Sequence, residues 1–251
     1  HINIIKIIIL IILIIYIFIM KHFTCKKPGI GNVLVKFLKT LCLNPKSLIN
    51  INKSLLILIF NKKIGILSNN SNNLIPFDNN KQYYLFDISK NNLDIYKKLL
   101  QHFKIKPKII KNVNIFINEL EEKYDINKIF SLHIRSWNSD TNVATNNQKA
   151  YGRSQKFNLN VYIKKIDILL ENKYEYFFVS TDNNNIINQL KSIYGDKVLY
   201  YSKNNSISNI QNDFTNMLLL GKFKTFIVTK GSTFSQFSYL FSKIDQYLIF
   251  C

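Results

Sequence analysis

The sequence has few of the residues that build cross-linked or fibrous proteins: 3 Cys, 4 Pro and 7 Gly among 251 residues. Cys25, Cys42 and Cys251 are too few for a disulfide framework, and without a CxxC spacing or a nearby histidine pair they give no zinc signature. The low Gly and Pro content excludes a collagen-like or proline-rich scaffold. Since 47% of the residues are hydrophobic, a packed core can be buried and must supply the stability.

Acidic residues are also scarce. The sequence has 15 acidic and 34 basic residues, which gives a net charge of +19. Lysine supplies 32 of the basic residues, and they are spread from Lys6 to Lys243 among Ile and Asn, which AT-rich codons also favour. A nucleic-acid-binding protein gathers its basic residues in a stripe, often with interleaved aromatics. The scattered pattern therefore favours a solvated basic surface over nucleic-acid binding, although the charge would attract an anionic substrate.

Motifs of metal-dependent and hydrolytic enzymes are absent as well. The sequence has no convincing DxD motif, no GxSxG or HExxH motif, and no cluster of His or carboxylate residues with metal-ligand spacing. We therefore predict neither a bound metal nor a cofactor.

The apolar leader, residues 1–19, has two interpretations. Residues 7–20 are unbroken apolar, and residues 4–20 nearly reach the roughly 20 residues of a membrane-spanning helix, with Lys6 snorkelling at one end. In the first interpretation residues 1–19 are a signal-anchor of a single-pass membrane protein. In the second, Met20 is the true start, the upstream run is a product of AT-rich sequence, and the protein is cytoplasmic.

From residue 21 onward, apolar β-rich runs alternate with helical periodicity, which predicts parallel sheets covered on both faces by helices. We expect an α/β fold of two Rossmann-like domains with mostly parallel sheets, over residues 20–125 and 126–251. In such folds ligands bind at the carboxyl ends of the strands. The predicted strands are 21–26, 54–60, 82–88, 128–134, 176–180, 197–201, 225–229 and 246–250; the predicted helices are 33–42, 91–103, 113–124, 159–171, 184–194, 210–220 and 233–241.

Arginine use gives the sharpest functional signal. The chain has only two arginines, Arg135 and Arg153, and they lie within 19 residues of each other. Arginine is a rigid bidentate fork suited to phosphate, and lysine does not replace it. Arg135 follows the predicted strand 128–134, with His133 two residues earlier on the same side of that strand. This pattern favours phosphate binding; the alternative is that the arginines fell together by chance and His133 is a core histidine.

Three further segments each join a predicted strand to a helix. The segment 229–235, TKGSTFS, opens a helix whose N–H groups and hydroxyls could bind an anion, although Ser232 or Thr233 could equally be an ordinary N-cap. Gly29-Ile30-Gly31-Asn32 suits close approach to a ligand but also a plain turn, with Asn32 as the N-cap. Asp182, after strand 176–180, could accept from a sugar hydroxyl or a base edge, or cap the next helix.

In their order along the chain, these segments resemble the metal-independent fucosyltransferases of the GT-B fold that carry an HxRR-type motif. That family includes the α1,2-, α1,6- and protein O-fucosyltransferases. The matching segments are PGIGN at 28–32, HIRS at 133–136, YFFVSTDN at 176–183, and the run from Asn216 to STFS at 232–235. The resemblance implies transfer of fucose from GDP-fucose, with inversion and without a metal, to a hydroxyl of a glycan or protein.

The resemblance also implies roles for individual residues. Arg135 and His133 would be the catalytic residues: Arg135 would hold the β-phosphate, and His133 would help to shape the donor pocket. Ser232 and Thr233 would bind the pyrophosphate, and Gly31 and Asn32 would approach the donor from the other domain. The full donor-binding set is Gly29, Gly31, Asn32, Asp182, Asp213, Asn216, Ser232, Thr233, Phe234 and Ser235.

Two departures from the family pattern keep alternatives open. Ser136 stands where HxRR has its second arginine, which weakens the phosphate clamp unless Arg153 acts as an accessory phosphate ligand. Asn216 stands where the family often has an aspartate that reads guanine, and Asp213 lies three residues earlier. The alternatives are therefore another nucleotide sugar on the same scaffold, or a non-catalytic, membrane-tethered binding protein.

Overall fold

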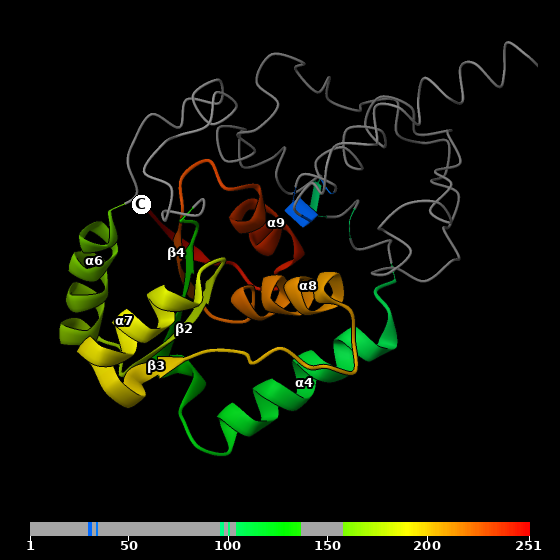
Figure 1. Cartoon of the computed structure of the whole chain (residues 1–251), viewed down its shortest axis with the longest axis horizontal. Coiled ribbons are helices and arrows are strands. Elements are labelled where there is room, and N and C mark those ends of the chain that lie inside the picture. The colour runs from blue at the N-terminus through cyan, green and yellow to red at the C-terminus, as the bar shows by residue number, and fades with distance from the viewer. Residues whose placement is uncertain (1–29, 32–33, 35–95, 98–99, 101–103, 137–157) are drawn as a thin grey trace, which may run out of the picture.

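Five parallel strands form one sheet at the centre of this computed structural model, which describes residues 30–31, 34, 96–97, 100, 104–136 and 158–251 (Figure 1). The strands are β1 (Ile129–Ile134), β2 (Tyr176–Thr181), β3 (Val198–Leu199), β4 (Thr225–Val228) and β5 (Tyr247–Phe250). The helices are α4 (Pro107–Glu121), α6 (Leu159–Asn172), α7 (Asn184–Tyr194), α8 (Asn209–Leu220) and α9 (Thr233–Phe241), with short 3₁₀ turns at Ile126–Lys128 and Gly195–Lys197.

The strand order is β3-β2-β1-β4-β5, and every pair of neighbours is parallel. The chain therefore moves outward from β1 through β2 to β3, and then returns to the other side of β1 through β4 to β5. This is the order of a doubly wound Rossmann-type half, in which the reversal opens a crevice at the carboxyl ends of the two central strands. The fold thus places β1 and β4 on either side of the expected ligand position.

Helices cover both faces of the sheet, with α6 and α7 on one face and α4, α8 and α9 on the other (Figure 1). The side chains of β1 alternate between the faces, because successive residues of a strand point to opposite sides. Phe130, Leu132 and Ile134 join the core under α6 and α7. Ser131 and His133 face α8 and α9, where the Ser131 hydroxyl donates to the Leu220 carbonyl at 2.9 Å.

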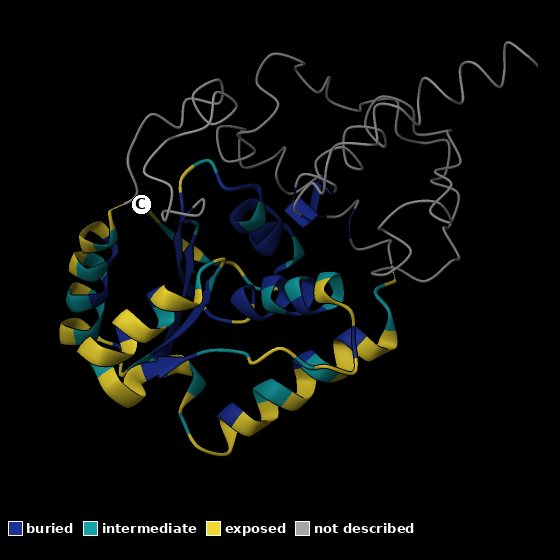
Figure 2. Cartoon of the chain, in the orientation of Figure 1, coloured by how far each residue is buried: buried dark blue, intermediate teal, exposed yellow. Residues whose placement is uncertain are grey.

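Aromatic side chains fill much of this core, and strands β1 to β4 are buried along most of their length (Figure 2), whereas the edge strand β5 is partly exposed. On one face Phe178 meets Phe116 of α4 edge-on at 5.5 Å and stacks with Phe223 at 5.7 Å. On the other face Phe130 and Phe177 stack at 5.5 Å. Each fully buried phenylalanine contributes about 2–3 kcal/mol relative to an exposed one, so the sheet is a rigid platform for whatever lies at its edge.

The α/β class with a parallel sheet, predicted from the alternating pattern, is confirmed for the second half of the chain. The bounds of α7 and α9 match their predicted ranges, whereas β3 is shorter than 197–201. Helix α4 begins at Pro107 and not at residue 113, because proline suits the first turn of a helix. Its residues Val113 and Leu120 join the core of this sheet, although the sequence division placed them in the first domain.

Most of the predicted first domain lies outside the described residues, including the strands 21–26, 54–60 and 82–88 and the leader 1–19. Ile30, Gly31 and Leu34 are helical, so helical structure is present before the predicted start at residue 33, and Ile30 and Leu34 pack into the core beside α9. None of the described helices combines the length and the apolar character that crossing a membrane would require. The division into two domains and both interpretations of the leader stay predictions.

Candidate functional site

The hydroxyl of Thr229 ties together the ends of β1 and β4 and helix α6 at the carboxyl edge of the sheet. It donates to the carbonyl of His133 at 2.8 Å, accepts from the backbone N–H of Arg135 at 3.0 Å, and lies 2.9 Å from the Tyr162 hydroxyl of α6. A threonine hydroxyl has one proton, which goes to His133, so Tyr162 is the donor in the third bond. Burial raises the pKa of Tyr162 to about 12, which keeps that donor protonated. The last residues of β1 are thus fixed to β4 and α6.

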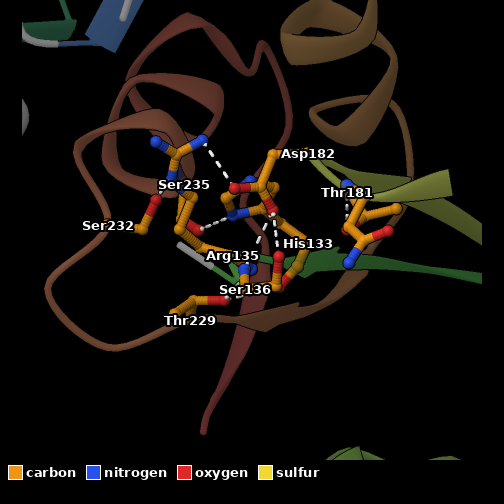
Figure 3. A network of polar contacts seen from close by, with 9 residues as sticks. His133, Arg135, Ser136, Thr181, Asp182, Thr229, Ser232 and Ser235 are labelled. Carbon is orange, nitrogen blue, oxygen red and sulfur yellow. Dashed lines mark hydrogen bonds and ion pairs between the residues drawn. The ribbon is translucent and has the colours of Figure 1, made fainter. Parts of the chain in front are cut away.

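Arg135 follows β1 and forms an ion pair with Asp182, which follows β2. Its Nη1 lies 3.0 Å from Oδ2 of Asp182, and the Arg135 side chain is 40% exposed against 17% for Asp182. Oδ1 of Asp182 accepts from the backbone N–H of Ser136 at 2.9 Å and from its hydroxyl at 3.0 Å. The carboxylate therefore stands between the guanidinium and Ser136, as Figure 3 shows.

His133 is buried between β1 and α9. Its Nδ1 lies 2.7 Å from the Ser235 hydroxyl, and its ring stacks on Phe234 with 4.8 Å between the centroids. Burial, helped by the nearby charge of Arg135 and opposed by Asp182, lowers the pKa of His133 from 6.5 to about 3. The imidazole is therefore neutral at physiological pH, and it holds the first turn of α9 against β1.

The first turn of α9 lies beside His133 and Arg135 (Figure 3). Gly231 has a positive φ of 73°, which a glycine adopts without strain, and it turns the chain from β4 into the helix. Ser232 is the N-cap, and its hydroxyl accepts from the N–H of Ser235 at 3.4 Å. A Cβ on Gly31 would lie 2.5 Å from the Thr233 hydroxyl and 2.8 Å from the Phe234 nitrogen. Only glycine allows the N-terminal helical segment to approach α9 so closely.

Asp213 and Asn216, both on α8, have different surroundings. Burial raises the pKa of Asp213 above its ordinary value, and the charges of Lys203 and Arg135 partly offset the rise. Asp213 therefore lies within electrostatic reach of the site. Asn216 donates back to the Asn212 carbonyl of its own helix at 3.4 Å. Of the two residues predicted to read the base, Asp213 is the one whose charge interacts with Arg135.

The structure brings together most of the predicted site residues that it describes. Gly31, Thr233 and Phe234 meet at the start of α9, whereas Gly29, Asn32 and Arg153 lie outside the described residues. The alternative that Asp182 caps α7 is wrong, because the N-cap is Asn183, whose side chain accepts from the Asn185 N–H. Because the cap is one residue after Asp182, the Asp182 carboxylate is available to pair with Arg135.

Sequence reasoning missed Tyr162 and the roles of Thr229 and Ser136. Tyr162 lies in the predicted helix 159–171, and nothing in its helical spacing distinguishes a tyrosine that donates a hydrogen bond from one that only packs. Thr229 carried a usable signal, since it is the polar residue that ends an apolar strand of the sheet. In the part of the chain that the structure describes, no group of three or more His, Cys, Asp or Glu side chains could hold a metal ion.

The arrangement is suited to an anion that carries oxygen acceptors. It offers a fixed, partly exposed guanidinium, hydroxyl groups, and the N–H groups of the first turn of a helix, whose dipole also favours negative charge. All of these stand at the carboxyl edge of β1 and β4, where the strand order reverses.

We expect the neutral state of His133 to make stability depend on pH. In the unfolded chain His133 binds a proton below pH 6.5, whereas in the folded chain it does so only below about pH 3. The free energy of unfolding therefore falls as the pH drops through that window. Between pH 7 and pH 5 the loss from this group is about 2 kcal/mol. Urea unfolding of the wild type and His133→Gln at both pH values measures it, and an equal pH slope in the two proteins would contradict the assignment.

Comparisons with known proteins give likeness in structure alone. No family model matches the chain, and no curated protein matches it in sequence. The fucosyltransferase NodZ from Bradyrhizobium is 19% identical over 62% of this chain and 48% of that one, with a TM-score of 0.42. NodZ alpha-1,6-fucosyltransferase soaked with GDP-fucose is 18% identical over 63% and 49%, with a TM-score of 0.43. POFUT1 in complex with GDP-fucose is 12% identical over 66% and 51%, with a TM-score of 0.41. The chain thus spans about half the length of the structures it matches.

Proposed function

We propose that this chain is a glycosyltransferase of the GT-B type that transfers fucose from GDP-fucose to a hydroxyl of a glycan or a protein, with inversion and without a metal. One observation carries the proposal: the Arg135 guanidinium, exposed over 40% of its side chain, stands at the switch point of a parallel sheet beside the first turn of α9. The sequence resemblance to the fucosyltransferases that carry an HxRR-type motif names the donor.

Fucosyl transfer from GDP-fucose requires that the diphosphate leaving group be stabilised. The bond between fucose C1 and the β-phosphate oxygen breaks, a bond from the acceptor oxygen to C1 forms on the opposite face, and the acceptor proton leaves to a base. Negative charge grows on the diphosphate during this step, and preorganised donors aimed at that charge lower the barrier. Arg135 supplies a positive charge and a rigid fork of donors for that purpose.

The start of α9 supplies the neutral donors. The Ser232 hydroxyl accepts from the Ser235 N–H, so its own proton remains available to a phosphate oxygen. Gly31 lets a second backbone segment approach Thr233 and Phe234, which is the close approach that a donor held between two domains requires. Positioning of donor and acceptor then contributes much of the rate, because in-line attack depends on alignment.

The nucleobase and the sugar of the donor are assigned by the sequence resemblance. Asn216 cannot accept two guanine N–H groups as a carboxylate does, and its side-chain amide donates to the Asn212 carbonyl of its own helix. Asp213, near Arg135 and Lys203, is the carboxylate closest to that role. Hydrolysis tests with a panel of nucleotide sugars would separate a GDP-fucose enzyme from one that uses another donor. A non-catalytic binding protein would turn over none of them.

The direct test is calorimetric titration of the 251-residue chain with GDP in the presence of EDTA. We expect micromolar binding by the wild type and a loss of about 10- to 100-fold in Arg135→Ala, the size of a charge-assisted bond to phosphate. Arg135→Lys keeps the charge and loses the fork, so its affinity should fall between the two. Absence of GDP binding by a folded wild-type chain would contradict the proposal.

The Thr229 hydroxyl, directly after β4, offers a second test, with a control at the start of that strand. Thr229→Val removes all three hydrogen bonds of the hydroxyl. One of them holds the Arg135 backbone, so we expect GDP affinity to fall about fivefold, as for one lost hydrogen bond. Thr225→Val removes a comparable bond, 2.6 Å to the Tyr174 hydroxyl, at the other end of β4. It should lower the melting temperature and leave GDP affinity unchanged. Equal effects of the two variants on GDP affinity would refute a specific role for Thr229.

A further inference from the structure

Both oxygens of the Asp182 carboxylate are engaged by the protein itself. Oδ1 accepts from the backbone N–H and the hydroxyl of Ser136, and Oδ2 pairs with Nη1 of Arg135 at 3.0 Å (Figure 3). Only 17% of the side chain is exposed. A carboxylate that is held in this way from two sides is a poor acceptor for a sugar hydroxyl or a base edge, which was the role expected for it from the sequence.

The same contacts fix the orientation of Arg135. A guanidinium carries five N–H donors in one rigid plane, so holding one corner sets the direction of the others. The pair with Asp182 uses the Nη1 corner, and 40% of the side chain stays exposed. The backbone of Arg135 is held separately by the Thr229 hydroxyl at 3.0 Å. The arginine is therefore restrained at both ends before any ligand arrives.

We propose that Asp182 and Ser136 are positioning residues that aim the Arg135 guanidinium at the diphosphate of the donor. Ser136 stands where the related motif has a second arginine, so this chain replaces a two-arginine clamp by one arginine held in place by a carboxylate. The inference rests on the proposed function for its ligand, although the restraint on Arg135 can be measured without one.

A rival effect has the opposite sign. The negative charge of Asp182 repels a diphosphate, so its removal could strengthen phosphate binding. Arg135 is partly exposed, and water and salt screen a repulsion that acts beyond direct contact. The hydrogen-bonded orientation of the guanidinium is a contact effect, and screening leaves more of it intact. We therefore expect the orienting effect to dominate, and the sign of the change in affinity decides between the two.

The binding experiment compares Asp182→Asn with the wild type in the full 251-residue chain, with GDP and with inorganic pyrophosphate as ligands. We expect affinity for both ligands to fall about tenfold, as for the loss of one charge-assisted hydrogen bond. Ser136→Ala should also lower both affinities, by a smaller factor than Asp182→Asn. Ser136→Thr keeps the hydroxyl and should bind both ligands as the wild type does. In an Arg135→Ala background, Asp182→Asn should cause no further loss, because the residue acts through the arginine.

Glu175→Gln is the matched control for the change in charge. Glu175 pairs with Lys128 at 3.6 Å before β1 and β2, at the opposite edge of the sheet, and its side chain is 58% exposed. This variant removes the same charge as Asp182→Asn and should leave both affinities unchanged. Circular dichroism and the melting temperature establish that each variant is folded.

A ligand-free readout uses the fact that the chain has only two arginines. Nitrogen-15 labelling of arginine gives two side-chain Nε signals, and Arg135→Lys assigns them. In Asp182→Asn we expect the Arg135 signal to shift and to lose its restricted motion, while the Arg153 signal stays unchanged. An unaltered Arg135 signal would overturn the proposal whether or not GDP binds.

The binding outcomes are equally decisive. Tighter GDP binding by Asp182→Asn would show that the carboxylate competes with phosphate, and unchanged binding would show that it does not act on Arg135. A loss seen with GDP-fucose but absent with GDP and pyrophosphate would mean that Asp182 contacts the sugar. Each of these results overturns the positioning role and leaves the proposed function standing. Failure of the folded wild type to bind GDP would instead remove the proposed function, and the Nε signals would still decide whether Asp182 restrains Arg135.

Discussion

The three hydrogen bonds of the Thr229 hydroxyl hold the candidate site at the point where the strand order reverses. Parallel strands that diverge at a switch point leave their carboxyl ends open to solvent. Here the hydroxyl connects the end of β4 to the carbonyl of His133, the N–H of Arg135 and the hydroxyl of Tyr162. The end of β1 is therefore fixed relative to β4 and α6.

Two buried polar residues of β1 lie beside the candidate site. Ser131 and His133 occupy positions of β1 that face α8 and α9, and both are buried. A buried polar group costs free energy unless it is hydrogen-bonded, and each has a partner on a helix. The neutral His133 holds α9 where its first turn faces Arg135, so a residue predicted to be catalytic contributes by positioning a helix. The proposed diphosphate would then meet one positive charge and a set of neutral donors.

The elements of the second half could be predicted from sequence because apolar runs and helical periodicity are local signals. The prediction failed where a single residue shifts the geometry. Pro107 starts α4 earlier than its apolar pattern suggests, and Asn183 takes the capping position that was one of the two alternatives for Asp182. Arg135 was singled out correctly as a residue at the carboxyl end of a strand, since two arginines among 32 lysines stand out.

The partners of the polar residues could not be predicted, because they come from distant parts of the chain. Ser136 and Asp182 are 46 residues apart, Arg135 and Thr229 are 94 apart, and His133 and Ser235 are 102 apart. No spacing rule connects such pairs until the strand order is known. Ser136 illustrates the consequence: by comparison with the related motif it counted as a loss, and in the fold it anchors the carboxylate that restrains Arg135.

A crystal structure of the chain with GDP bound would test the central claim most directly. The account predicts the β-phosphate within hydrogen-bonding distance of the Arg135 guanidinium and of the first turn of α9, with the ion pair to Asp182 retained. GDP bound at another edge of the sheet, or a phosphate in contact with neither Arg135 nor α9, would contradict it.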